Sequence, residues 1–143
     1  MGKWLLFHYK IPPEPSAPRV YIWRKLKKIG AILVQDAVWI LPNNPRTREQ
    51  FQWLTVEITD LKGEATFWVA DLGLGSQEEF LARLFSEQTD QAYTEILESL
   101  DGPDPNLGEL SQQYQLIRAR DYFHSEMGGR VRERLVVARE NEP

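Results

Sequence analysis

The sequence contains no cysteine, which excludes disulfide bonds, thiolate catalysis and zinc sites built on cysteine. It has only two histidines, His8 and His124, and they form no HExxH metal-binding pattern. No apolar run approaches the roughly 20 residues needed to cross a bilayer. The apolar run at residues 5–7 is too short for the core of a signal peptide. These absences predict a cytoplasmic protein with no metal site, no cofactor and no catalytic residues.

The composition is that of a folded protein with an uneven charge distribution. Of the 143 residues, 42% are hydrophobic, which favours one globular domain over a disordered chain. The net charge is −4, but residues 1–62 carry +5, residues 63–109 carry −10 and residues 110–143 carry +1. This segregation indicates either a bipolar surface, suited to an anionic ligand or to self-association, or solvated helix faces that differ in sign.

The order of the elements predicted for the first half is βαββαβ. Residues 4–9 form a continuous apolar run typical of a buried strand, and residues 31–41 read as a hairpin with its turn at Gln35 and Asp36. Residues 64–72 alternate as a further strand. With helices at 16–30 and 47–62, we predict a ferredoxin-like α+β fold, an antiparallel four-stranded sheet with two helices on one face.

Helical patterns continue after this α+β core. An acidic helix to about residue 100, a helix over roughly 107–124 and a short helix over 130–140 are separated by breaks at 101–105 and at the two glycines 128 and 129. We expect residues 1–72 to be the ferredoxin-like core. Residues 73–143 are then a helical extension of two or three helices packed on it within a single domain.

The helix predicted for residues 16–30 holds the strongest site candidates. Its wheel places Arg19 inside the apolar arc of Ile22 and Leu26, where a charge is costly without a partner. Arg19 is then either a snorkelling or internally paired side chain, or part of an anion site. The amides at the Ser16 end of the helix favour negative charge, so we name Ser16, Arg19 and Arg24 as the candidate anion-binding residues. The geometry suits tetrahedral oxyanions and phosphates equally.

A basic run continues along the same helix. Lys25, Lys27 and Lys28 lie outside the apolar arc and read as a solvated face or, alternatively, as candidate nucleic-acid contacts. The overall acidic charge weighs against strong DNA binding, and we find no helix-turn-helix pattern.

Several blocks of sequence together resemble a known family. They comprise a first strand from Trp4 to Tyr9, a long ungapped block from Pro15 to Ala31 that includes Arg19 and Trp23, a third block at residues 38–42 and a fourth at residues 51–58. Shorter matches follow at residues 63–65 and 121–123. This pattern is similar to the N-terminal domain of ChrB, the regulator linked to bacterial chromate resistance, over roughly residues 4–125.

The resemblance implies a non-catalytic regulatory or sensor module that responds to chromate or a similar oxyanion and acts on transcription. It further implies a homodimer, with DNA as a candidate partner and no association with membranes. The second domain of longer ChrB proteins is absent from this chain, so we expect either a stand-alone version or a separate protein that supplies that half.

The same fold also occurs in the phenylacetate repressor PaaX and in a small CRISPR-associated nuclease. The alternative function is therefore nucleic-acid processing of that nuclease type. Such activity would need an acidic residue near the end of the first strand to hold Mg²⁺, where this chain has His8, Tyr9 and Lys10.

Overall fold

The computed structural model describes residues 2–142, which form two compact units divided between Gln77 and Glu78. The packing of the helical extension on the core stays a prediction. The first unit contains two helices and four strands, in the order β1 (Trp4–Lys10), α1 (Ala17–Lys28), β2 (Ile32–Val34), β3 (Val38–Pro42), α2 (Pro45–Asp60) and β4 (Glu64–Ala70).

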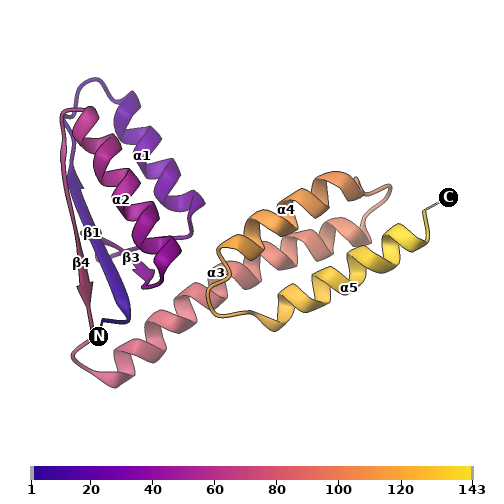
Figure 1. The fold of residues 1–143 in the computed structure, drawn as a ribbon. Coiled ribbons are helices and arrows are strands. Elements are labelled where there is room, and N and C mark those ends of the chain that lie inside the picture. The colour runs from indigo at the N-terminus through magenta and orange to yellow at the C-terminus, as the bar shows by residue number, and fades with distance from the viewer. Residues whose placement is uncertain (1, 143) are drawn as a thin grey trace. The chain divides into compact units, whose positions relative to one another are not determined.

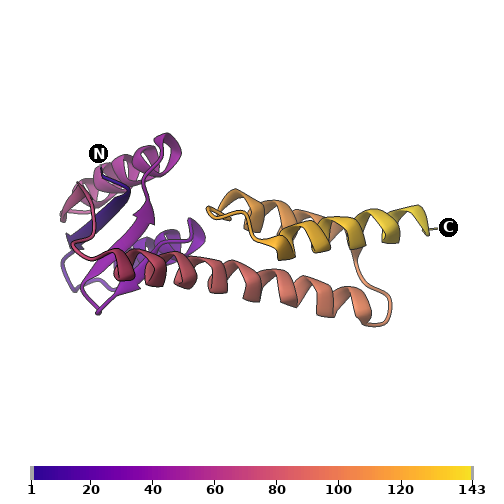
Figure 2. The same ribbon diagram turned by 90° about the horizontal axis from the view of Figure 1, so that it is seen from below.

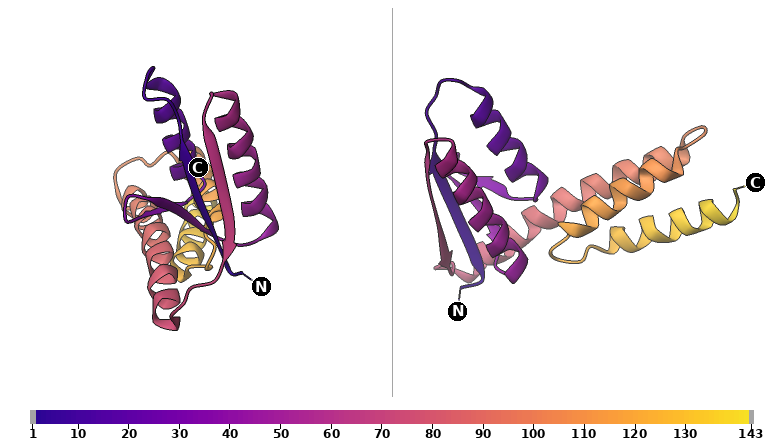
Figure 3. Two further views of the ribbon diagram at one scale, coloured as in Figure 1. Left: turned by 90° about the vertical axis from the view of Figure 1, so that its left-hand side faces the viewer. Right: turned by 45° about the horizontal axis from the view of Figure 1, so that its top comes forward.

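The four strands form one antiparallel sheet in the order β2-β3-β1-β4. In the register, Phe7 of β1 lies opposite Trp39 of β3 on one side and Phe67 of β4 on the other. Helices α1 and α2 lie on the same face of this sheet (Figure 1; Figure 3, right). The predicted α+β class and βαββαβ order are confirmed.

Apolar side chains on the helix-facing side of the sheet form the core of this unit. Leu5 and Phe7 of β1 are fully buried, as are Ile22 of α1 and Phe51 of α2. The rings of Phe7 and Phe51 stack with their centroids 4.7 Å apart. The alternate residues of β1 and the regularly spaced apolar residues of α1 and α2 thus pack together in one layer between sheet and helices.

Helix α2 begins two residues earlier than the sequence pattern predicted. Asn44, not Thr47, is the N-cap residue, and its side chain accepts from the Thr47 N–H at 2.8 Å. The Thr47 hydroxyl accepts from the Asn44 N–H at 2.9 Å, which completes a reciprocal capping box. Thr47 itself is completely buried, so this polar side chain is satisfied locally.

Gly63 follows the end of α2 but is not its C-cap. Leu61 is the C-cap, and Lys62 is the residue with a left-handed backbone, at φ 69°. Gly63 is needed for a different reason. A Cβ at this position would lie 2.4 Å from the Lys10 carbonyl oxygen and 2.8 Å from the Ile58 side chain. Only glycine permits this close approach of the chain to β1.

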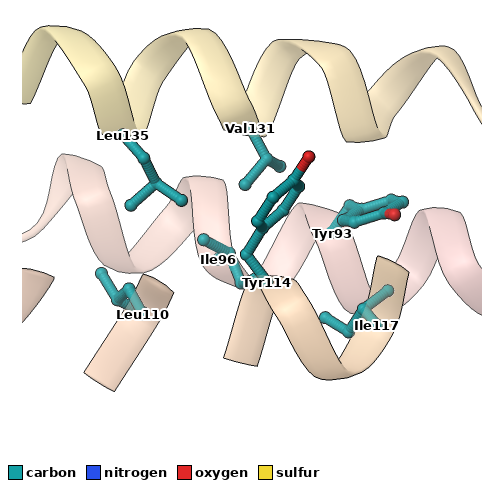
Figure 4. Packing of buried hydrophobic residues seen from close by; sticks show 7 residues of the cluster. All are labelled: Tyr93, Ile96, Leu110, Tyr114, Ile117, Val131 and Leu135. Carbon is teal, nitrogen blue, oxygen red and sulfur yellow. The ribbon is translucent and has the colours of Figure 1, made fainter. Parts of the chain in front are cut away.

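The second unit is formed by three helices, α3 (Gly75–Asp101), α4 (Leu107–Ala119) and α5 (Glu126–Glu140). Figure 2 shows α4 and α5, in orange and yellow, side by side above α3. Seven buried residues form the core between the three helices (Figure 4): Tyr93, Ile96, Leu110, Tyr114, Ile117, Val131 and Leu135.

Helix α5 begins before the two glycines that we expected to interrupt it. Gly128 is buried inside the helix, and a Cβ there would lie 3.0 Å from the Tyr93 hydroxyl oxygen. The small residue therefore lets α5 approach the large Tyr93 ring rather than ending the helix.

A polar network ties the α4–α5 turn to α3. The Tyr93 hydroxyl donates to Asp121 Oδ2 at 2.9 Å, and Asp121 also accepts from the Ser125 N–H at 3.1 Å. The Ser125 hydroxyl contacts Asp90 of α3 and accepts from the Met127 N–H as the α5 cap. Asp121 therefore accepts hydrogen bonds from Tyr93 of α3 and from Ser125, the N-cap residue of α5.

Candidate anion-binding site

The buried stripe of α1 is narrower than its helical wheel suggested. Ile22 and Leu26 are fully buried, whereas Arg19 is exposed and Trp23 is 48% exposed. Arg19 and Trp23 lie about 60° and 100° round the helix from Ile22, on one flank of the stripe. The expectation that Arg19 is buried in the apolar arc is wrong. The helical wheel treated Trp23 as a buried residue, which extended the apolar arc as far as Arg19, but Trp23 is itself half exposed.

Arg19 instead lines a pocket within the first unit, with a volume of about 440 Å³. Three parts of the chain form its walls: the end of β1 and the loop after it, one flank of α1, and the β2–β3 hairpin. The side chains with most chemical capability are those of Tyr9, Lys10, Arg19, Trp23 and Trp39. The pocket thus combines two cations and the Asp36 carboxylate with the rings of one tyrosine and two tryptophans.

The Arg19 guanidinium has no carboxylate partner in the described part of the chain. Within residues 2–142 it forms no ion pair, although the Asp36 carboxylate lines the same pocket. Its charge also reaches Tyr9, where it lowers the pKa of the phenol but by less than burial raises it. A guanidinium without a carboxylate partner keeps its full fork of donors for an oxyanion.

Tyr9 supplies a neutral donor beside that charge. Partial burial raises the pKa of the Tyr9 hydroxyl, and this outweighs the opposing effects of the Arg19 charge and of a hydrogen bond from the Trp39 side chain. Because the Trp39 indole can only donate, the Tyr9 oxygen is the acceptor in that bond. The Tyr9 proton therefore stays available for a ligand at neutral pH.

His8 also lines the pocket, and its ring is engaged with Trp68 of β4. Its Nε2 accepts from the Trp68 indole N–H at 2.7 Å, and the two rings stack with centroids 6.1 Å apart. The positive charge of the pocket comes from Arg19 and Lys10.

The structure does not bring the other two predicted anion-binding residues into this pocket. Ser16 occupies the N-cap position of α1, but its exposed side chain makes no capping hydrogen bond. Arg24 is exposed, and neither residue lines the pocket. Of the predicted trio, Arg19 alone lies there.

The three lysines named as candidate nucleic-acid contacts have separate surroundings. Lys25 forms a 2.8 Å ion pair with Glu57 of α2, whose hydrogen bond is the main cause of a raised Lys25 pKa. Lys27 lies over the Trp23 ring, 5.4 Å from its centroid, and Lys28 is exposed. They do not form one continuous cluster, because Lys25 faces α2 and Lys27 faces Trp23.

The sequence reasoning missed Tyr9, Lys10 and Trp39 as site residues. Tyr9 and Trp39 share the helix-facing side of the sheet, because Phe7 pairs with Trp39 and Tyr9 is two residues further along β1. Strand alternation together with a hairpin register could have placed them there. Lys10 is the last residue of β1, so a correct strand boundary would have placed it beside Tyr9 at the same end of the sheet.

The described part of the chain, residues 2–142, shows no cluster of three or more histidine, aspartate or glutamate side chains that could hold a metal ion. None of the helices in that range is both long and apolar enough to cross a membrane.

Comparison with known proteins identifies relatives by sequence. No solved structure was found to match. The curated protein ChrB of Cupriavidus metallidurans is 28% identical over 115 residues, which cover 80% of this chain and 35% of that protein. The chain thus spans about a third of the length of this relative. The family model described as "Protein ChrB, N-terminal" matches residues 19–107, more than half of the chain. The resemblance carried by the sequence blocks is therefore confirmed, and the chain belongs to the ChrB N-terminal family.

Proposed function

We propose that the chain is a non-catalytic sensor module of a bacterial chromate-resistance system, which binds chromate or a similar oxyanion and acts on transcription. Family membership supports the biological setting. The observation that carries the binding step is Arg19, a guanidinium without an ion-pair partner in a pocket that Tyr9 and Lys10 also line.

The chemistry of the pocket suits a tetrahedral dianion. Arg19 offers two parallel N–H donors, Tyr9 offers a neutral hydroxyl, and Lys10 adds a second charge. The aromatic walls lower the local polarity, which strengthens each charge-assisted hydrogen bond. The pocket is larger than one oxyanion, so ordered waters would complete the contacts.

The direct test is calorimetric titration of the purified protein with chromate, sulfate and phosphate, in parallel with Trp fluorescence. We expect saturable binding that weakens with salt, and a dissociation constant raised roughly tenfold or more in Arg19→Gln. Trp23 lies in the pocket on the same helix, so its emission should change on binding. Arg83→Gln removes one exposed positive charge from the second unit and is the matched control.

Arg24→Gln decides whether Arg24 belongs to the site. Unchanged binding places it outside, as its absence from the pocket lining suggests. Oxyanion binding that is the same in Arg19→Gln and wild type would contradict the proposal. Cleavage of DNA or RNA by the purified protein that needs Mg²⁺ and stops with EDTA would favour the nuclease alternative.

A further inference from the structure

A second pocket lies in the helical unit, between α4 and α5. It is an open groove of about 910 Å³ within residues 108–139. Its floor is apolar, from Tyr114, Leu135, Leu116 and Val136. Leu116 is 61% exposed and Val136 is 48% exposed, so the groove displays apolar surface that the three-helix core does not bury.

The charged residues that line the groove are all basic. Arg118, Arg132 and Arg139 contribute to its walls, and no carboxylate does. None of the three forms an ion pair within residues 2–142, and Arg139 donates to the Ser111 hydroxyl at 2.9 Å. By contrast, Arg134, which does not line the groove, pairs with Asp101 of α3.

The arginines mark the two ends of the groove. The hydrogen bond from Arg139 to Ser111 places the end of α5 beside the start of α4, so the two helices run antiparallel. Arg118 near the end of α4 and Arg132 near the start of α5 then lie toward the other end. Ser111 and Arg118 are seven residues apart on α4, which is about 10 Å along the helix axis.

We propose that this groove docks a helix of a partner protein that carries two acidic side chains about two turns apart with apolar residues between them. The apolar stripe would cover Leu116 and Val136, and the two carboxylates would pair with the arginines at either end. This surface belongs to the second unit and goes beyond the oxyanion site of the first.

Charge argues against a second copy of the chain as the occupant. A two-fold contact through this groove would bring the same three arginines of each copy together, with no acid in the lining to neutralise them. The acidic helix α3 is a poor match as well. The exposed position between Glu87 and Glu95 on its outer face is Gln91, and Phe85 and Tyr93 are buried. Phe80 is 53% exposed, but the exposed Arg83 lies one turn further along the same side and would repel the arginines of the groove.

The test begins with a display library of helical peptides with random outer positions, selected against the intact chain. We expect enriched peptides to share two acidic residues seven positions apart, with leucine or isoleucine between them. An enriched motif that is basic or uncharged would overturn the proposal, as would failure to enrich any motif.

Variants then locate the site on the protein. Charge reversal in Arg118→Glu with Arg132→Glu should weaken binding of the selected peptide roughly tenfold or more. Arg130→Glu reverses one charge on α5 outside the groove and should alter binding by less than about twofold, whereas Arg132→Glu alone, which makes the identical change inside the groove, should weaken it by more. Leu116→Gln removes the exposed apolar contact without touching the core and should also weaken binding.

Rescue separates docking from a loss of folding. A peptide with lysine in place of the acid that faces Arg118 and Arg132 should bind the charge-reversed variant better than the wild type. The proposal fails if that peptide shows no gain while circular dichroism shows both proteins folded. It also fails if sedimentation shows that the wild type self-associates through the groove, or if anionic lipid vesicles compete with the peptide.

Discussion

The hydrogen bond from Tyr93 to Asp121 allows a prediction about stability with a defined magnitude. Tyr93→Phe keeps the buried ring and removes only the hydroxyl, which is a donor to a carboxylate at 2.9 Å. Hydrogen bonds to charged groups contribute about 1.5–3 kcal/mol. Asp121 keeps the Ser125 N–H as a partner, so the variant leaves no orphaned acceptor. We therefore expect a value at the lower end of this range, a loss of about 1.5 kcal/mol in the free energy of unfolding.

The same contact gives the prediction a pH signature. Burial, and then the hydrogen bond to Asp121, raise the pKa of Tyr93 far above the usual value of about 10. Above pH 10 the unfolded chain releases this proton while the folded chain retains it. The contribution is therefore fully present below pH 10 and is lost as pH rises further, at up to about 1.4 kcal/mol per pH unit. The gap between wild type and Tyr93→Phe should nearly close by about pH 11.

Urea unfolding followed by circular dichroism at pH 7, 9, 10 and 11 measures both effects. Tyr114→Phe is the matched control, because Tyr114 lies in the same cluster and its hydroxyl makes no hydrogen bond within residues 2–142. It should change stability by less than about 0.5 kcal/mol at every pH. A Tyr93→Phe variant as stable as wild type at pH 7, or a gap that does not narrow above pH 10, would refute this account of the network.

Three further substitutions test the first unit by the same urea assay. Asn44→Ala removes the capping box of α2 and should cost about 1 kcal/mol, whereas an effect near zero would show that the Thr47 side chain caps the helix alone. Phe51→Ala deletes a fully buried ring stacked on Phe7 and should cost about 3–5 kcal/mol; a loss below about 1 kcal/mol would contradict the packing. Gly63→Ala forces a methyl group against the Lys10 carbonyl and should cost roughly 1–3 kcal/mol, and a neutral result would mean that β1 moves freely there.

The architecture of the first unit was predictable because periodicity and turn residues agree along it. The Gln35–Asp36 turn was found from two short apolar runs alone, and both residues have a positive φ at the centre of a tight turn that the Ala37 N–H closes on the Val34 carbonyl oxygen. The boundaries of the helices were less predictable. Thr47 reads as a cap in the sequence, but the register of the preceding loop makes Asn44 the cap. Gly128 reads as a break because its role depends on Tyr93, 35 residues away.

The candidate site was predictable only in part, because its residues come from separate elements. Arg19 was found from an anomaly local to one helix, a charge near an apolar face. Tyr9 and Trp39 look like ordinary core aromatics in the sequence, and only the pairing of β1 with β3 brings them to Arg19. The groove of α4 and α5 was not foreseen, because the helix predicted to extend to about residue 124 ends at Ala119 and the next begins at Glu126.

In the turn between β2 and β3, the residues that would be most stable differ from the residue that contributes a charge to the pocket. Gln35 and Asp36 both hold a left-handed backbone, at φ 53° and 55°, without the glycine that relieves this conformation. An Asn-Gly pair would form the turn more readily, but it would remove Asp36, the carboxylate in the pocket lining. That carboxylate weakens the binding of any anion in the pocket, and the sensor that we propose must release its ligand when the external concentration falls. A strained aspartate in this turn would therefore raise the ligand concentration at which the pocket fills and so keep binding reversible.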